Sequence, residues 1–159
     1  VFVFQGLAML SVATPLWVGL ANSNVSAFQT SIGSLAKIGA GLWVIGFLFE
    51  TIGDWQLVQF KKRRAVLGPE ITGKVMDKGL WKFTRHPNYF GNSAMWWGIW
   101  LVACQAPWGW ASIVGPLFMT LALVKLTGAG HLERTLSQRP EYAEYMQRTS
   151  MFIPWFPKK

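Results

Sequence analysis

Four long apolar stretches constrain this chain more than any other feature of its sequence. They cover residues 1–20, 32–52, 89–106 and 111–126, each near the roughly 20 residues that a helix needs to cross a bilayer, and we expect helices near 1–20, 32–58, 89–106 and 111–128. In lipid, backbone N–H and C=O groups must pair within their own segment, which favours helices. The sequence therefore predicts an all-α fold, a polytopic integral membrane bundle with about four transmembrane helices.

The composition is that of a membrane protein. Hydrophobic residues make up 52% of the 159 residues, charged residues only 14%, and the mean hydropathy is +0.28. No repeat or linker divides the chain, which we interpret as one membrane domain over residues 1–159. The chain starts at Val1 directly in an apolar run, without the charged region of a signal peptide. We therefore expect the C-terminal part of a longer protein.

Charge is concentrated in one loop. Residues 61–85 include eight basic and two acidic residues, a net charge of +6, whereas residues 21–31 and 104–110 include no charged residue. By the positive-inside rule, the loop 61–88 and the tail from residue 131 are predicted to be cytoplasmic in a multi-pass protein. The same basic loop suits contact with anionic membrane lipids.

Two acidic residues lie at the cytoplasmic end of the second span. Glu50 and Asp54 are four residues apart, so they share one face of a helix, where like charges repel each other. Acidic residues within membrane segments usually face a cavity and mark a site. The alternative is that both have reached the wet interface, and the sequence leaves these two interpretations open.

The stretch "GLWKFTRHPNYFGN", residues 79–92, places polar side chains at the start of the third span. Pro87 disfavours helix at His86 and suits the first turn of a helix, whose N-terminus attracts anions. The guanidinium of Arg85 fits phosphate or carboxylate. This pattern predicts an anion site at the cytoplasmic edge of the membrane. Alternatively, Arg85 and His86 reach lipid headgroups, while Tyr89 and the tryptophans after it form an aromatic belt.

Several familiar classes of site are missing from the sequence. It has one cysteine and two histidines, with no HExxH-type spacing, no serine elbow and no glycine-rich nucleotide fingerprint after a strand. We therefore expect no metal, no soluble-type dinucleotide fold and no nucleic-acid partner.

The stretch 79–92, the tryptophan-rich span after it and the tail "YAEYMQRTSMFIPW" resemble the C-terminal part of the steroid 5-alpha-reductase superfamily. The similarity covers essentially the whole chain and is greatest to the uncharacterised bacterial branch. It implies an integral membrane reductase that transfers hydride from NADPH to a conjugated C=C bond of a steroid-like or other lipid substrate. Sterol reductases that act on ring double bonds share a similar arginine–histidine–proline–asparagine–tyrosine signature, which residues 85–89 match. Membrane methyltransferases for phospholipids and isoprenylated cysteine share a looser arginine–histidine–proline–any–tyrosine pattern. S-adenosylmethionine-dependent methyl transfer and a non-enzymatic membrane module are therefore the alternatives.

The resemblance also implies roles for individual residues. Asp54 matches an acid near the adenosine end of the cofactor, while Asn88 and Tyr89 match positions that line the nicotinamide pocket. Asn92 stands where the family usually has an acid, and Glu50 where the steroid enzymes have Asn. The implied cofactor-binding residues are Asp54, Arg85, His86, Asn88, Tyr89, Asn92 and His131, and the implied substrate-pocket residues are Glu50, Trp96 and Trp97. The proton donor of the steroid enzymes lies on N-terminal helices that precede this stretch, so no catalytic residue is assigned.

Charge favours NADPH over S-adenosylmethionine as the cofactor. NADPH carries roughly four negative charges at neutral pH, which suits a loop of net charge +6. S-adenosylmethionine has a cationic sulfonium and less need of such a field. Against this, Glu133 matches half of the glutamate pair of the methyltransferases, although Leu132 stands in the other half.

Overall fold

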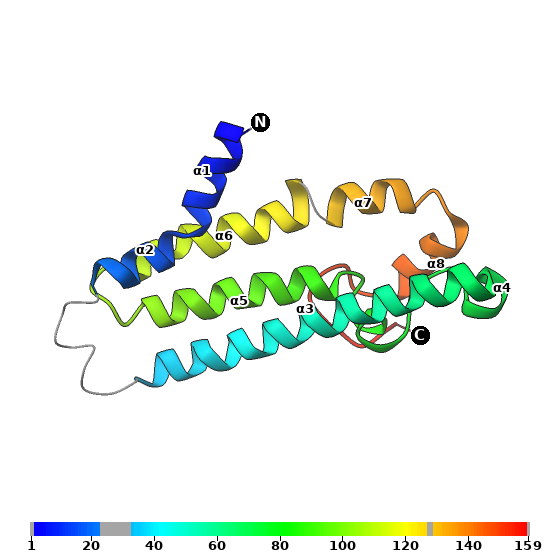
Figure 1. The fold of residues 1–159 in the computed structure, drawn as a ribbon, viewed down its shortest axis with the longest axis horizontal. Coiled ribbons are helices and arrows are strands. Elements are labelled where there is room, and N and C mark those ends of the chain that lie inside the picture. Colours follow the sequence, from blue (N-terminus) through cyan, green and yellow to red (C-terminus); the bar gives the residue numbers. More distant parts are fainter. Residues whose placement is uncertain (1, 23–32, 127–128, 159) are drawn as a thin grey trace. The chain divides into compact units, whose positions relative to one another are not determined.

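The computed structural model describes residues 2–22, 33–126 and 129–158 (Figure 1). All regular structure in these ranges is helical, which confirms the prediction of an all-α fold. Contacts divide the chain into two compact units, the first made of residues 1–46 and 93–122 and the second of residues 47–92 and 123–159. Both boundaries near residues 46 and 92 fall inside continuous helices, so this division does not test the prediction of a single membrane domain.

Helix α3 (Ser34–Leu67) begins two residues after the start of the second predicted span, residues 32–58, and ends nine residues beyond it. Its 34 residues correspond to about 50 Å at about 1.5 Å per residue, well beyond a hydrocarbon core of about 30 Å. Among the described residues it is the one helix that is long and apolar enough to cross a membrane. The predicted count of about four such helices is therefore not shown.

The first predicted span, residues 1–20, forms two helices instead of one. Helix α1 (Phe2–Val12) and helix α2 (Thr14–Ala21) have 11 and 8 residues and are separated at Ala13. The break has a local cause, because Pro15 has no N–H to donate and suits the first turn of a new helix.

The third and fourth spans also differ in length from their predictions. Helix α5 (Pro87–Ala103) has 17 residues and begins two residues before the predicted span. The fourth stretch is a succession of short elements: the 3-10 helix η3 (Gly109–Ile113), helix α6 (Val114–Leu121) and the π-helical turn η4 (Ala122–Leu126).

Within the first unit, α3 and α5 meet backbone to backbone. A Cβ atom built on Gly39 would lie 2.6 Å from the Gly98 carbonyl oxygen, and one built on Gly98 would lie 2.8 Å from the Trp43 nitrogen. Small residues permit such close approach between helices and are typical of membrane helix interfaces.

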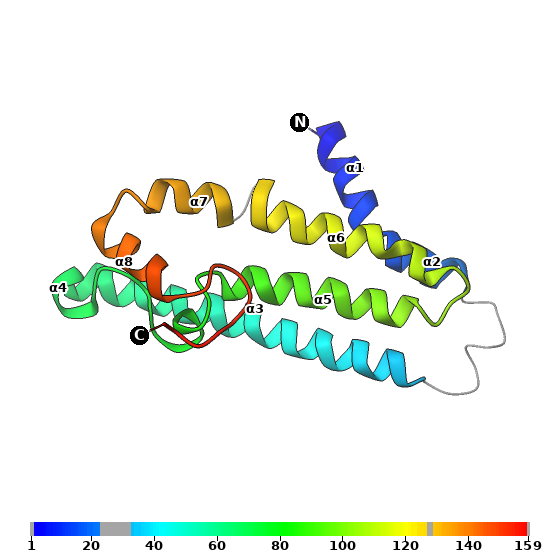
Figure 2. The same ribbon diagram turned by 180° about the vertical axis from the view of Figure 1, so that it is seen from behind.

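The second unit surrounds a core of aromatic and polar side chains. It comprises the C-terminal half of α3, helix α4 (Pro69–Thr72), the 3-10 helix η2 (Gly79–Lys82), the start of α5, helix α7 (Ala129–Leu136) and helix α8 (Pro140–Arg148). The indole of Trp81 donates from Nε1 to the Gly53 carbonyl at 3.0 Å, and the Tyr145 hydroxyl donates to the Trp81 carbonyl. After α8 the chain returns to the residues before α5, as Figure 2 shows in red and green.

Candidate functional site

Arg85 and His86 lie buried at the beginning of α5. The segment before them is not helical, and Pro87 is the first helical residue, as the sequence predicts. The His86 carbonyl accepts from the Phe90 N–H at 3.0 Å, which closes the first turn of the helix. The helix start therefore fixes the direction of both side chains.

The Arg85 guanidinium is bound by a carboxylate and two carbonyls. Nε donates to Glu133 Oε1 at 2.7 Å and Nη2 to Glu133 Oε2 at 2.9 Å. Nη1 donates to the Met146 and Thr149 carbonyls at 2.7 and 3.1 Å. A guanidinium has five N–H donors, so one is left without a partner in the described ranges, and the positive charge of Arg85 is already compensated by Glu133. Its role as a cofactor-binding residue stays a prediction.

His86 shares the same carboxylate. Its Nε2 lies 3.0 Å from Glu133 Oε1, and because an ionised carboxylate only accepts, Nε2 carries the hydrogen in this contact. The imidazole also stacks on Tyr89, one turn later in α5, with ring centroids 5.2 Å apart and planes 4° apart. The ring is therefore held on one face by Tyr89 and at its Nε2 edge by Glu133.

Glu133 is the residue of this cluster whose position the sequence did not reveal. Burial raises the pKa of its carboxyl, but the hydrogen bonds from His86 and Arg85 outweigh burial and bring the pKa below its ordinary value. The carboxylate is therefore ionised at neutral pH. The sequence did contain a signal for this pairing: a buried arginine needs an acidic partner, and the chain has only seven acidic residues.

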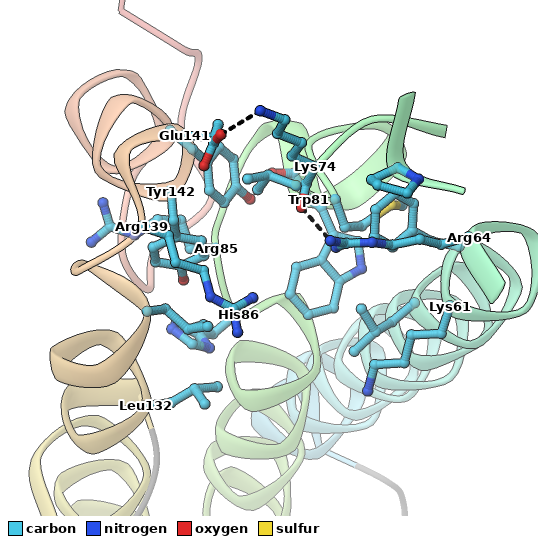
Figure 3. Close-up of a pocket in the computed structure, with 17 residues that line it drawn as sticks. Lys61, Arg64, Lys74, Trp81, Arg85, His86, Leu132, Arg139, Glu141 and Tyr142 are labelled. Carbon is cyan, nitrogen blue, oxygen red and sulfur yellow. Dashed lines mark hydrogen bonds and ion pairs between the residues drawn. The ribbon is translucent and has the colours of Figure 1, made fainter. Parts of the chain in front are cut away.

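A cavity of about 590 Å³ adjoins this cluster within the second unit (Figure 3). Lys61 and Arg64, on the last turns of α3, lie across it from His86 and Leu132. Lys61, Arg64 and Arg139 line the cavity, and no ion pair of theirs occurs within the described ranges. The rest of the wall is largely apolar and aromatic, with Phe60, Trp81 and Tyr142 among its side chains. The cavity thus combines cations with flat ring surfaces.

Tyr142 gives the cavity a phenol. Burial raises its pKa to about 12, and the negative charge of Glu133 acts in the same direction. At neutral pH this side chain is therefore protonated and can donate a hydrogen bond to a ligand.

A loop with glycine at each end closes one side of the cavity. Gly73 and Gly79 have φ values of 91° and 62°, which other residues rarely adopt, and Val75 and Met76 between them line the cavity. Two exposed ion pairs connect this loop to α8, Lys74 with Glu141 at 2.7 Å and Asp77 with Arg148 at 3.0 Å. Arg64 Nη1 also donates to the Lys74 carbonyl at 2.8 Å.

The two acids predicted on α3 each face an asparagine of α5. Asn88 Nδ2 donates to Asp54 Oδ1 at 2.9 Å, and one turn away Asn92 Nδ2 lies 3.3 and 3.4 Å from the Glu50 oxygens. Asn92 Oδ1 is buried and has no hydrogen-bond partner within the described ranges. These four residues do not line the cavity, so their roles toward a cofactor or substrate stay predictions.

The remaining predicted residues lie elsewhere. Trp96 and Trp97 belong to the first unit, where Trp97 Nε1 donates to Thr120 Oγ1 at 3.1 Å. Their place in a substrate pocket stays a prediction. His131 falls within α7, but its side chain lies outside the described residues.

One comparison with known proteins gives a family. A model described as "Protein of unknown function (DUF1295)" matches residues 1–149, which include the stretch 79–92, Glu133 and every side chain that lines the cavity. No curated protein and no solved structure matches the chain. Because the family model covers nearly the whole sequence, the chain belongs to the DUF1295 family.

Proposed function

We propose that this protein is an integral membrane reductase that uses NADPH to reduce a conjugated C=C bond of a steroid-like or other lipid substrate. The observation that carries the proposal is the cavity beside Arg85 and His86. Its lining includes five lysine and arginine side chains and one carboxylate, that of Glu141. Its volume of about 590 Å³ lies within the range of about 300–1,000 Å³ that is usual for ligand pockets.

The residues present fit such a cofactor. Lys61, Arg64 and Arg139, which have no carboxylate partner among the described residues, suit phosphate groups, for which charge-assisted hydrogen bonds are strong. Trp81 and Tyr142 offer ring faces for flat heterocycles. When bound, NADPH supplies the hydride, while the protein binds, orients and excludes water.

In this proposal Arg85 has a different role from the one that its motif suggests. Since Glu133 and two carbonyls use four of its five donors, Arg85 holds the cavity wall in place and offers one N–H to a ligand. His86, fixed by Glu133 and Tyr89, presents its ring to the cavity. Asp54, Asn88 and Tyr89 do not line this cavity, and Asn88 Nδ2 donates to Asp54 Oδ1 at 2.9 Å, so the nicotinamide and adenosine roles that the resemblance implies for them stay predictions outside this proposal.

The membrane part of the proposal rests on α3 and on charge. Apolar side chains of α3 such as Val44, Ile45 and Leu48 are exposed, and contact with lipid would remove them from water. We propose a multi-pass protein with the loop 61–88 and the tail from residue 131 in the cytoplasm, where NADPH is available.

Methyl transfer is the second candidate function. Glu133, which matches part of the methyltransferase pattern, is buried in contact with both Arg85 and His86 of the shared motif. The cation-lined cavity argues against it, because S-adenosylmethionine carries a cationic sulfonium.

Thermal denaturation of the full-length protein in detergent separates these candidates. A ligand at about 100 times its Kd stabilises the folded state by about 2.7 kcal/mol, so binding raises the Tm. We expect NADPH to raise the Tm and S-adenosylmethionine to leave it unchanged. The reverse result would replace the reductase with a methyltransferase, and no response to either would leave a non-enzymatic membrane module.

A further inference from the structure

The segment after α8, residues 149–158, is fixed to the residues that precede α5; we call it the tail segment. The Ser150 carbonyl accepts from the Arg85 N–H at 2.9 Å, and the Trp155 N–H donates to the Phe83 carbonyl at 2.9 Å. The Thr84 hydroxyl lies 2.9 Å from the Phe152 carbonyl. The backbone of the tail segment therefore follows the position of residues 83–85.

The residues that precede α5 are fixed at one position along α3, beside Gly53. Pro87 packs on Gly53, where an added Cβ would meet Pro87 Cγ at 3.1 Å, and the Trp81 indole bonds to the carbonyl of the same glycine. The proposed function has α3 cross the membrane; with entry into the hydrocarbon at its first residue, Ser34, about 20 residues bring it to the opposite edge near Gly53. The tail segment then lies at the boundary between hydrocarbon and headgroups.

The exposed side chains of the tail segment suit that boundary. Ile153, Trp155 and Phe156 are 65%, 70% and 77% exposed, although all three are large and apolar. Pro154 and Pro157 have no N–H group, so this part of the backbone brings fewer unpaired donors toward lipid. Adjacent exposed apolar residues are typical of interaction sites, and tryptophan is enriched in the interfacial belts of membrane proteins.

The charges near the tail segment complement anionic lipid. Lys82 is exposed beside Phe83, Lys158 follows the aromatic residues, and neither residues 79–92 nor residues 149–159 include an aspartate or glutamate. Cations beside apolar side chains attract phosphate headgroups while the apolar groups enter the acyl region.

We propose that the tail segment is an interfacial anchor for the bilayer face near Gly53. The side chains of Ile153, Trp155 and Phe156 enter the boundary between headgroups and acyl chains, while Lys82 and Lys158 face anionic lipid phosphates. The proposal rests on the membrane crossing of α3 given above. By its bonds to residues 83–85, the anchor sets the depth at which Arg85 and His86 are held.

A second exposed apolar group provides a matched control. Val66 is 83% exposed, but it lies 13 residues beyond Gly53 on α3, or about 20 Å at about 1.5 Å per residue. The headgroup layer adds only about 5–8 Å to each side of the hydrocarbon core, so Val66 stands in water. Val66 and the tail segment are both exposed, so exposure does not distinguish them. Their expected depths relative to the bilayer do.

Fluorescence quenching measures that depth. The full-length protein with Cys104→Ser receives a single cysteine by Phe156→Cys, Val66→Cys or Val44→Cys, each labelled with an environment-sensitive fluorophore. The variants are placed in nanodiscs of phosphatidylcholine, with or without phosphatidylglycerol, that contain lipids with a nitroxide near the headgroup or near the chain end. We expect strong quenching at position 156 by the shallow nitroxide, quenching at 44 by the deep one, and little quenching at 66.

Each other outcome has a distinct meaning. If position 156 is as unquenched and as water-exposed as position 66 while position 44 is quenched, the anchor is wrong and the membrane crossing stands. If position 156 is shielded from water but not quenched by lipid, protein covers it, and the anchor is again wrong. If position 44 is not quenched, the proposed crossing of α3 fails, and the anchor fails with it. With Lys82→Gln and Lys158→Gln together, any extra quenching in phosphatidylglycerol should disappear.

Discussion

Arg85 and Glu133 form a two-point ion pair, with N–O distances of 2.7 and 2.9 Å, in which both side chains are buried. His86 binds the same carboxylate at 3.0 Å, so one acid stabilises two consecutive residues of the motif. Buried ion pairs of this kind contribute little net stability when intact, but removing one partner leaves a buried charge without compensation. This asymmetry makes the pair sensitive to single substitutions.

Replacement of Arg85 should therefore act mainly on stability. We expect Arg85→Ala to lower the free energy of unfolding by about 3–5 kcal/mol, the usual cost of breaking a buried pair. Arg63→Ala, which removes an exposed guanidinium of α3, should cost less than about 1 kcal/mol. Thermal denaturation in detergent measures both. If Arg85→Ala keeps the wild-type Tm and only weakens NADPH binding, Arg85 is a ligand contact and not a structural residue.

The pH dependence of stability should report on Glu133. Its pKa in the folded protein is below the ordinary value of 4.5, so its contribution is fully present above 4.5 and is lost as pH falls through the folded-state pKa. We expect the Tm of the wild type to fall in that acidic range and the fall to be smaller in Glu133→Gln. Glu141→Gln is the control for an exposed carboxylate with a lowered pKa. Equal acid sensitivity in the wild type and Glu133→Gln would contradict this prediction.

Substitution of two adjacent lysines tests whether the cations that line the cavity bind the phosphate groups of NADPH. Lys61 lines the cavity and Lys62 does not, although both are exposed cations of α3. A hydrogen bond to a charged group contributes about 1.5–3 kcal/mol, so we expect Lys61→Gln to weaken NADPH binding about tenfold or more. Lys62→Gln should change it little. The effect of Lys61→Gln should shrink at high salt, and equal effects of the two changes would remove the cavity as the cofactor site.

Alanine substitutions at two glycines with positive φ test backbone strain and steric clash separately. An added Cβ at Gly68 meets no atom within 4 Å, but φ of 78° and ψ of 166° lie in a region that almost only glycine adopts, so backbone strain alone should make Gly68→Ala cost about 1–3 kcal/mol. Gly79→Ala adds a Cβ 2.4 Å from Gln56 Nε2 and would displace the side chain that accepts from the Leu80 N–H. We expect the second change to lower the Tm more than the first. The opposite order would show that the side chain of Gln56 moves aside freely.

Cysteine labelling in intact membranes tests the orientation. Ser26→Cys, in the uncharged loop outside the described residues, should react with an impermeant reagent added from outside, and Thr72→Cys should not. The prediction follows from the net charge of +6 in residues 61–85. The reverse labelling pattern would place the cavity on the side opposite to cytoplasmic NADPH.

Local features of the fold were predictable from the sequence, and distant contacts were not. Pro87 correctly marked the start of α5, because proline acts on its immediate neighbours. Pro15 is equally local, and it lies in the first turn of a new helix within residues 1–20, which we predicted as a single span. The pairing of Arg85 with Glu133 joins residues 48 positions apart, and no periodicity indicates a contact of that kind. The spacing of Lys61 and Arg64 shows that they share a helix face, but not that a cavity adjoins it.

The partners of Arg85 also set an order for the biosynthesis of this protein. Its carboxylate and carbonyl acceptors are 48 to 64 residues further along the chain. At about 5–20 residues per second, roughly 3–13 s separate the synthesis of Arg85 from that of Thr149, 64 positions later. Until Glu133 is synthesised, after the first 48 of these residues, the guanidinium has none of its final acceptors and must remain hydrated or among headgroups. All acceptors of Arg85 are thus present only after the last helix, α8, has left the ribosome. A nascent chain halted before Glu133 exposes a cation that is buried in the finished protein.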